Sequence, residues 1–252
     1  MFRRWRILAF LFVTSCMCHA QDGATLKIAA AADLQPLLPG IIAQFERQYH
    51  TRAEASYASS ATLATQIVNG GPFGLFLSAD MSFPEKVVAA GLADTPKPIP
   101  YARGTLVLWA RNDSPAQPIR LESLRKRSVR TVAIANPEHA PYGRAAKAAL
   151  ENLGLTKAVQ DKLVVAENIG QAAQYADSGN ADAGLLSMTS AVTPRLTTDG
   201  KYVEMPAGSY PPIVQGAVVI KGPAAPEAHR FLDFLLSAPI RAQLAERGLR
   251  AP

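Results

Sequence analysis

Cysteine is scarce in this 252-residue chain, and its two copies, Cys16 and Cys18, both lie near the amino terminus. The rest of the sequence has none, which excludes a disulfide framework there, so the stability of that part must come from packing. Hydrophobic residues make up 48% of the chain. That fraction is enough for a sizeable core, in one large domain or two smaller ones.

Charge is also sparse, at 18% of residues, which argues against long disordered tails. The formal net charge is +6, but Arg3, Arg4 and Arg6 supply three of these charges within the first few residues. The basic cluster farther along, Arg125–Arg127 with Arg130, has no aromatic residues interleaved. We therefore expect no nucleic-acid surface.

Long apolar runs are missing after the amino terminus, so we expect no membrane span. The start of the chain is typical of an export signal, with a basic first segment, a short apolar stretch at Ile7 to Val13 and small residues at Cys18-His19-Ala20. We expect residues 1–20 to be a signal peptide and the protein to be periplasmic. The alternative is a lipoprotein cleavage box at Val13-Thr14-Ser15-Cys16, with Cys16 acylated.

Apolar strands alternate with helical patterns along the chain. The sequence predicts strands at 26–32, 53–57, 75–80, 105–110, 129–135, 183–186 and 214–220, and helices at 34–49, 62–68, 84–90, 144–153, 171–178 and 225–236. Pro96, Pro98 and Pro100 predict an irregular connection. This order predicts an α/β fold with parallel sheets and helices on both faces.

Four strand-to-helix turns carry small or polar residues: Asp33, Ser59-Ser60, Pro141-Tyr142-Gly143 and Asn168-Ile169-Gly170. In open parallel sheets, ligands bind at the carboxyl ends of the strands, where such turns lie. A helix start offers unpaired N–H groups and a partial positive charge, so these turns suit an anion. The alternative is that the serines merely cap the next helix; we also expect Asp33 to be an N-cap.

Six segments carry a resemblance to a known family: AAAADL (29–34), YASSATLATQI (57–67), GGPFGLFLSAD (70–80), ANPEHAPYGRAAKAAL (135–150), VVAENIGQA (164–172) and ADAGLLS (181–187). In order and spacing they resemble the periplasmic molybdate-binding proteins of ABC importers, which have the type II periplasmic binding protein fold. The resemblance covers nearly all of the chain after the leader. It implies two α/β lobes around a ligand cleft, which we place at 24–104 plus 216–252 and at 105–215.

The resemblance also implies a ligand and its contacts. The family binds a tetrahedral oxyanion, molybdate or tungstate, through hydroxyls and backbone N–H groups without a basic side chain. Carried over by position, the contacts fall on Asp33, Ser60, Tyr142, Ile169 and Ser187. The implied protein is a monomer that passes its oxyanion to a membrane permease, with no cofactor, no free metal cation and no enzymatic activity.

Two of these positions depart from the family's pattern. Asp33 stands where a serine is common, and Ser187 stands where some members have a tyrosine. A carboxylate beside a dianion would repel it by several kcal/mol at about 4 Å, with an effective dielectric constant near 20. We expect Asp33 to turn back as a helix cap; a changed ligand preference is the alternative.

Two other functions stay open from the sequence. One is the binding of a different small anion, such as sulfate. The other is an exported hydrolase, which is disfavoured because the sequence shows no nucleophile–base motif. The four histidines, His19, His50, His139 and His229, lack the spacing of a metal site.

Overall fold

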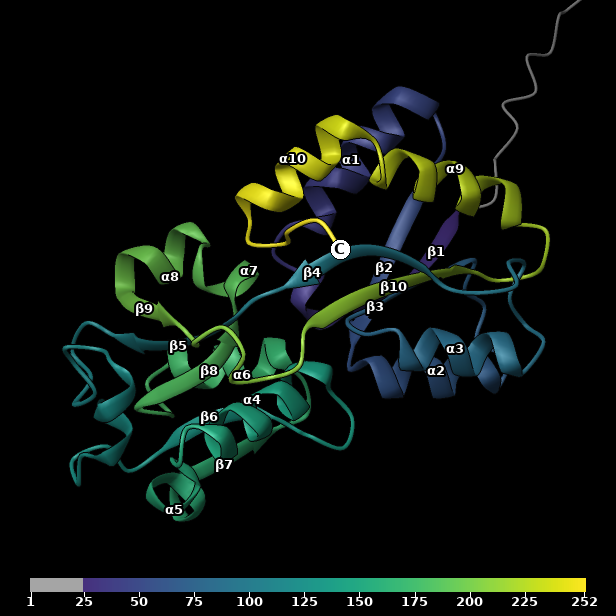
Figure 1. The fold of residues 1–252 in the computed structure, drawn as a ribbon. Helices are drawn as coiled ribbons and strands as arrows, with labels where there is room; N and C mark the ends of the chain where they lie inside the picture. The colour runs from purple at the N-terminus through teal and green to yellow at the C-terminus, as the bar shows by residue number, and fades with distance from the viewer. Residues whose placement is uncertain (1–24) are drawn as a thin grey trace, which may run out of the picture.

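A computed structural model describes residues 25–252, so the expected export signal and the alternative acylation site at Cys16 lie outside the described residues. Two five-stranded sheets form the framework, each flanked by helices (Figure 1). Within residues 25–252, no helix is long and apolar enough to cross a membrane.

The first sheet has the strand order β2-β1-β3-β10-β4. Its strands are β1 (Leu26–Ala31), β2 (Ala53–Ala58), β3 (Leu75–Ser78), β4 (Ile99–Gly104) and β10 (Ile213–Val219). Strand β1 pairs in parallel with β2 and β3, whereas β10 runs antiparallel to β3 and β4. Its helical segments are η1 (Ala32–Leu34), α1 (Leu38–Tyr49), α2 (Ser60–Val68), α3 (Ser82–Ala89), α9 (Ala225–Leu235) and α10 (Ala238–Glu246).

Helices cover both faces of this sheet because its central strands are apolar on both sides. Ile28 and Ala30 of β1 pack with α1, α9 and α10, whereas Ala29 between them packs with α2 and α3 (Figure 1). Phe45 of α1 meets Phe231 of α9 with ring centroids 4.9 Å apart. These two layers hold the carboxyl ends of β1, β2 and β3 at one edge of the sheet.

The second sheet has the order β7-β6-β8-β5-β9. Its strands are β5 (Leu106–Arg111), β6 (Val132–Ala135), β7 (Leu163–Ala166), β8 (Ala183–Ser187) and β9 (Gly200–Glu204). Strand β6 is parallel to β7 and β8, and β5 is antiparallel to β8 and β9. Its helical segments are η2 (Leu121–Arg125), α4 (Pro141–Asn152), α5 (Thr156–Val159), η3 (Gln160–Lys162), α6 (Ile169–Asp177), α7 (Met188–Ala191) and α8 (Pro194–Asp199).

The predicted α/β class is confirmed, but the sheets are mixed rather than wholly parallel. Strands β4 and β9 were not predicted. Strand β4 contains Pro100, which an edge strand tolerates because one side of it needs no ladder hydrogen bonds, and the register beside it shifts between Gln215 and Gly216. Strand β9 is a short polar edge strand, which gives little hydrophobic pattern to detect.

The chain passes between the two sheets twice, from β4 to β5 and from β9 to β10 (Figure 1). The first crossing is short, since Gly104 ends β4 and Leu106 begins β5. The second crossing contains Tyr210, whose hydroxyl accepts a hydrogen bond from the Leu106 N–H at 3.0 Å. The two crossings are therefore tied to one another beside the space between the lobes.

Candidate ligand-binding site

The four predicted turns converge on one small cavity between the lobes. Asp33 of η1, Ser60 of α2, Tyr142 of α4 and Ile169 of α6 all line it. The volume open to the centre of a water molecule is only about 10 Å³, which is about the space that one water molecule needs. Two of these residues come from elements of the first sheet and two from elements of the second.

Ser59 and Ser60 have different roles at the start of α2. Ser59 is the N-cap, and its hydroxyl accepts a hydrogen bond from the Thr62 N–H at 3.2 Å. Ser60 lies in the first turn, where its Oγ accepts from the Ala79 N–H at 3.1 Å. That bond fixes the oxygen but leaves the hydroxyl proton of Ser60 free to be donated. One serine is thus a cap, as the simpler interpretation holds, and the other is a candidate donor.

Helices α4 and α6 present their first turns to the same cavity. Helix α4 begins at Pro141, and Asn168 caps α6 by accepting from the Gln171 N–H at 3.0 Å. The N–H groups of Tyr142 and Ile169 belong to these first turns, and N–H groups in a first turn have no acceptor within their own helix. Gly143 lets α4 start here, because a Cβ on it would lie 2.4 Å from the Ala135 carbonyl oxygen.

The prediction that Asp33 caps a helix is wrong. Asp33 lies inside η1, whose N-cap is Ala31, and no side chain caps this segment. The Asp33 carboxyl is fully buried, and its Oδ2 accepts a hydrogen bond from Gln215 Nε2. Gln215 Nε2 also lies 3.4 Å from the Tyr142 hydroxyl. The physical reason is a tertiary contact: the buried Gln215 amide, 182 residues along the chain, supplies a better hydrogen-bond partner for the carboxyl than the local backbone does.

This burial changes the titration of Asp33. Loss of hydration raises the pKa of its carboxyl from 3.8 to about 7, although hydrogen bonding from Gln215 and Tyr142 opposes the rise. Burial, and then the nearby Asp33 charge, raise the pKa values of Tyr101 and Tyr142 well above the usual phenol value. The sequence prediction missed Gln215, yet its signal was visible as a lone amide in the apolar strand 214–220.

Ser187, the fifth predicted contact, is not among the residues that line this cavity. It is the N-cap of α7, and its Oγ accepts from the Ser190 N–H at 3.4 Å and from the Thr189 hydroxyl at 2.8 Å. The structure therefore brings four of the five predicted residues together and places Ser187 within a buried hydroxyl cluster beside α7.

Direct contacts between the lobes enclose the cavity. The Ala61 N–H donates to the His139 carbonyl oxygen at 3.2 Å, and the Thr62 hydroxyl donates to Glu167 at 3.4 Å. An ion pair joins Arg144 of α4 to Asp80, which follows β3. These contacts join the first turn of α2 to the loops before α4 and α6, and join α4 to the end of β3, so the lobes are closed on one another.

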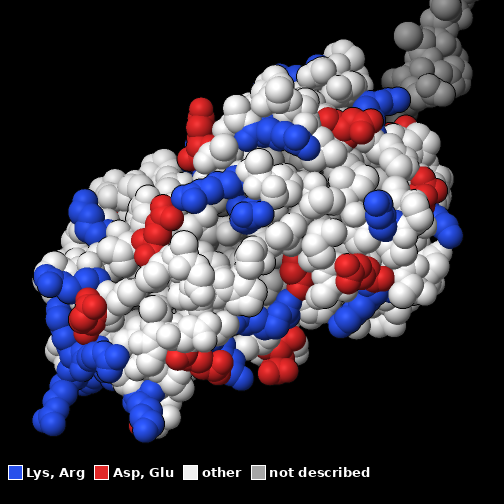
Figure 2. Space-filling model, in the orientation of Figure 1, with Lys and Arg blue, Asp and Glu red and all other residues white. Residues whose placement is uncertain are grey.

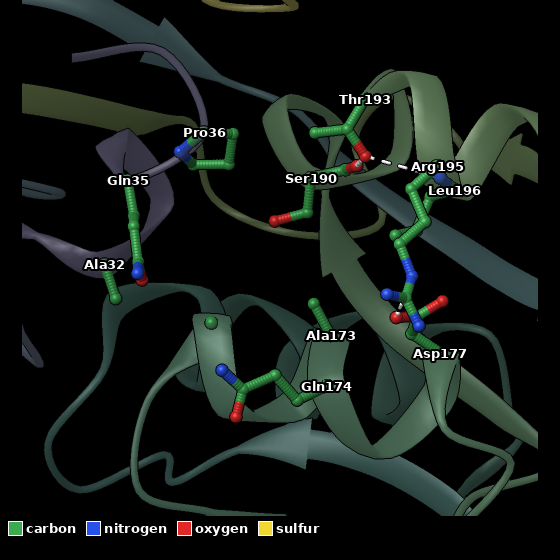
Figure 3. Close-up of a pocket in the computed structure, with 11 residues that line it drawn as sticks. Ala32, Gln35, Pro36, Ala173, Gln174, Asp177, Ser190, Thr193, Arg195 and Leu196 are labelled. Carbon is green, nitrogen blue, oxygen red and sulfur yellow. Dashed lines mark hydrogen bonds and ion pairs between the residues drawn. The ribbon is translucent and has the colours of Figure 1, made fainter. Parts of the chain in front are cut away.

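A second, wider pocket adjoins this cavity and shares Ala32 with it (Figure 3). Its volume for the centre of a water molecule is about 390 Å³, and Gln35, Gln174 and Ser190 are among its polar residues. The guanidinium group of Arg195 also lines this pocket, and it forms an ion pair with Asp177 at 2.8 Å. Because this cation is already neutralised, the small cavity, where the first turns of α2, α4 and α6 meet, is the better candidate for an anion.

Charged side chains are interspersed over the face shown in Figure 2, with broad uncharged areas between them. In the basic cluster of the second lobe, Lys126 donates to the Gln117 carbonyl oxygen at 2.7 Å and Arg125 to that of Gly154 at 3.1 Å. Part of this cluster thus holds loops in place. Across residues 25–252, no group of three or more His, Cys, Asp or Glu side chains could hold a metal ion.

Comparisons with known proteins find relatives that match over most of the chain. The chain is 34% identical to the molybdate-binding protein ModA of Azotobacter vinelandii over 235 residues, which cover 91% of each chain. It is 37% identical to the molybdate-binding protein ModA of Rhodobacter capsulatus over 231 residues, covering 90% of this chain and 88% of the relative. Among solved structures, the Azotobacter vinelandii periplasmic molybdate-binding protein matches with a TM-score of 0.82 and 32% identity, covering 90% of this chain and 99% of that one.

The family assignment does not depend on single relatives. The model of the bacterial extracellular solute-binding proteins matches residues 26–250, which include both sheets and every residue of the cavity. With this match, the chain belongs to the bacterial extracellular solute-binding protein family.

Proposed function

We propose that this protein captures a tetrahedral oxyanion, molybdate or tungstate, outside the cytoplasm and delivers it to the permease of an ABC importer. The observation that carries the proposal is the meeting of Asp33, Ser60, Tyr142 and Ile169, from both lobes, at one small cavity. The molybdate-binding relatives support this choice of ligand.

The energetics of such a site fit a dianion. A helix start contributes roughly 0.3–1 kcal/mol toward an anion, and up to about 2 kcal/mol where it is partly buried. Hydrogen bonds to a charged group add about 1.5–3 kcal/mol each. Three such bonds, from the Ser60 hydroxyl and the N–H groups of Tyr142 and Ile169, give about 4.5–9 kcal/mol. This range includes the roughly 8 kcal/mol that micromolar affinity requires.

Closure of the lobes supplies the capture step. We place the lobes at 24–104 plus 216–252 and at 105–215, except that residues 213–215 go with the first lobe because β10 belongs to the first sheet, with the hinge at the two crossings. The oxyanion docks while the lobes are apart, and contacts such as Asp80–Arg144 form as they close. The closed monomer then presents its guest to the permease. Export to the periplasm through residues 1–20 fits this role; lipid anchoring through Cys16 is the alternative.

Selection among oxyanions follows from size, because molybdate, tungstate and sulfate share charge and shape. Titration calorimetry with molybdate, tungstate, sulfate, phosphate and chromate tests the proposal. We expect molybdate and tungstate to bind most tightly. Sulfate as the tightest ligand would favour the second candidate, a binding protein for another small anion, and heat from none of the five would refute the oxyanion function.

A further inference from the structure

The Asp33 carboxyl is a fully buried acid in the wall of the proposed oxyanion cavity. A buried carboxylate normally has a cation beside it. Here the side chains that act on it are neutral: Gln215 on β10, Tyr142 on α4 and Tyr101 on β4. Its Oδ1 has no hydrogen-bond partner among the described residues.

The cationic groups nearby are engaged elsewhere or exposed. Within residues 25–252, no lysine, arginine or histidine forms an ion pair or hydrogen bond with Asp33. Arg144 pairs with Asp80. His139 is exposed, and its ring lies 3.4 Å from the Asn136 amide. An ionised Asp33 would therefore add an uncompensated negative charge to a cavity that also receives a dianion, and repulsion is strongest where water is excluded.

Resting on the proposed oxyanion function, we propose that Asp33 enters the closed complex as a neutral carboxylic acid, so that binding one dianion takes up one proton from solution. The carboxylate gains this proton, no other bond is made or broken, and the total charge brought into the cavity falls by one. Since Oδ2 accepts from Gln215, the proton resides on Oδ1, the oxygen that lacks a partner.

Tyr142 of the second lobe links this arrangement to the closed state through Gln215, which belongs to the same sheet as the strand before Asp33. Its Nε2 donates to Asp33 of the first lobe and lies 3.4 Å from the hydroxyl of Tyr142 in the second. Tyr142 also offers its backbone N–H to the cavity. The acid and this donor are thus positioned together only when the lobes meet. Burial, opposed by the hydrogen bonds to this carboxyl, already raises the pKa of Asp33 to about 7, and a dianion beside it raises the value further.

Calorimetry of molybdate binding at pH 8, in buffers of different ionisation enthalpy, measures the protons taken up. We expect close to one proton per molybdate for the wild-type protein, and affinity that falls about tenfold per pH unit above neutral. In Asp33→Asn the amide oxygen still accepts from Gln215, so the side chain keeps its place. This variant should bind with near-zero proton uptake and with affinity independent of pH.

Asp80→Asn is the matched control, because Asp80 is a carboxylate at the same edge of the first sheet but is paired with Arg144. It should retain the uptake of one proton. Wild-type protein that releases heat with molybdate but shows the same enthalpy in every buffer would overturn the inference, and this measurement needs no variant. Uptake that persists in Asp33→Asn and disappears in His139→Gln would assign the proton to the imidazole and likewise overturn it. Absence of heat with every oxyanion would instead overturn the proposed function.

Discussion

Removal of one hydroxyl, in Ser60→Ala, tests the design of the site most directly. Ser60 Oγ accepts from the Ala79 N–H at 3.1 Å, which leaves the hydroxyl proton for the guest. A hydrogen bond to a charged group contributes about 1.5–3 kcal/mol. We therefore expect the dissociation constant for molybdate to rise by roughly 10- to 150-fold.

Ser59→Ala is the matched control, because it deletes the same group one residue earlier. Ser59 caps α2 by accepting from Thr62, and loss of a cap costs about 0.5–2 kcal/mol of stability. For a chain of this size, each kcal/mol lowers the melting temperature by roughly 2–4 °C. The Ser59 variant should thus be less stable but bind molybdate with little change.

Two measurements separate these effects. Calorimetry gives the affinity, and urea unfolding without ligand gives the stability. Ser60→Ala also leaves the buried Ala79 N–H without its acceptor, so some loss of stability is expected there too. The reasoning fails if Ser60→Ala binds within about twofold of the wild type, or if Ser59→Ala loses as much affinity.

Three further predictions test other parts of the structure. Gly104→Ala would place a Cβ 2.2 Å from the Tyr142 hydroxyl oxygen and 3.2 Å from Gln215 Nε2, so the free energy of unfolding should fall by about 1–3 kcal/mol. Gly40→Ala is the control, because a Cβ there meets nothing within 4 Å, and its stability should be unchanged or slightly higher. The pKa of Asp33 is about 7 in the folded protein and ordinarily 3.8, so the stability of the wild type should fall as the pH rises from 3.8 to about 7. Asp33→Asn should remove this decline, and equal pH profiles of stability for the two proteins would contradict the prediction. Arg144→Ala breaks the partly exposed ion pair with Asp80, so molybdate affinity should fall by no more than about fivefold, roughly 1 kcal/mol. Stopped-flow experiments should show that molybdate leaves faster. An unchanged release rate would contradict the role of this ion pair in closing the lobes.

Local patterns predicted the α/β class and the four turns because each is set by neighbouring residues. Apolar strands ending at small residues, followed by helical spacing, are enough to place Ser60, Tyr142 and Ile169 at helix starts. The direction of β5 and β10 could not be predicted this way, since it depends on which strands they join in each sheet.

The side chain of Asp33 shows the limit most clearly. Its position after a strand favoured a cap, and only the fold reveals Gln215 as its partner. Ser187 is a different case: it lies at the end of β8, but its hydroxyl is engaged by Thr189 and Ser190, its near neighbours in the chain. The Asp33–Gln215 pairing joins segments 182 residues apart, so no local spacing encodes it, whereas the partners of Ser187 lie within three residues of it.

The place of β10 in the first sheet has a consequence for biosynthesis. Strands β3 and β4 do not pair with each other; β10, made more than a hundred residues after β4, stands between them. A ribosome therefore completes the second sheet before it has made the strand that joins the two halves of the first. Long-range pairing of this kind slows folding, so a chain that stops before Ile213 should leave β4 detached while β5 to β9 are all present.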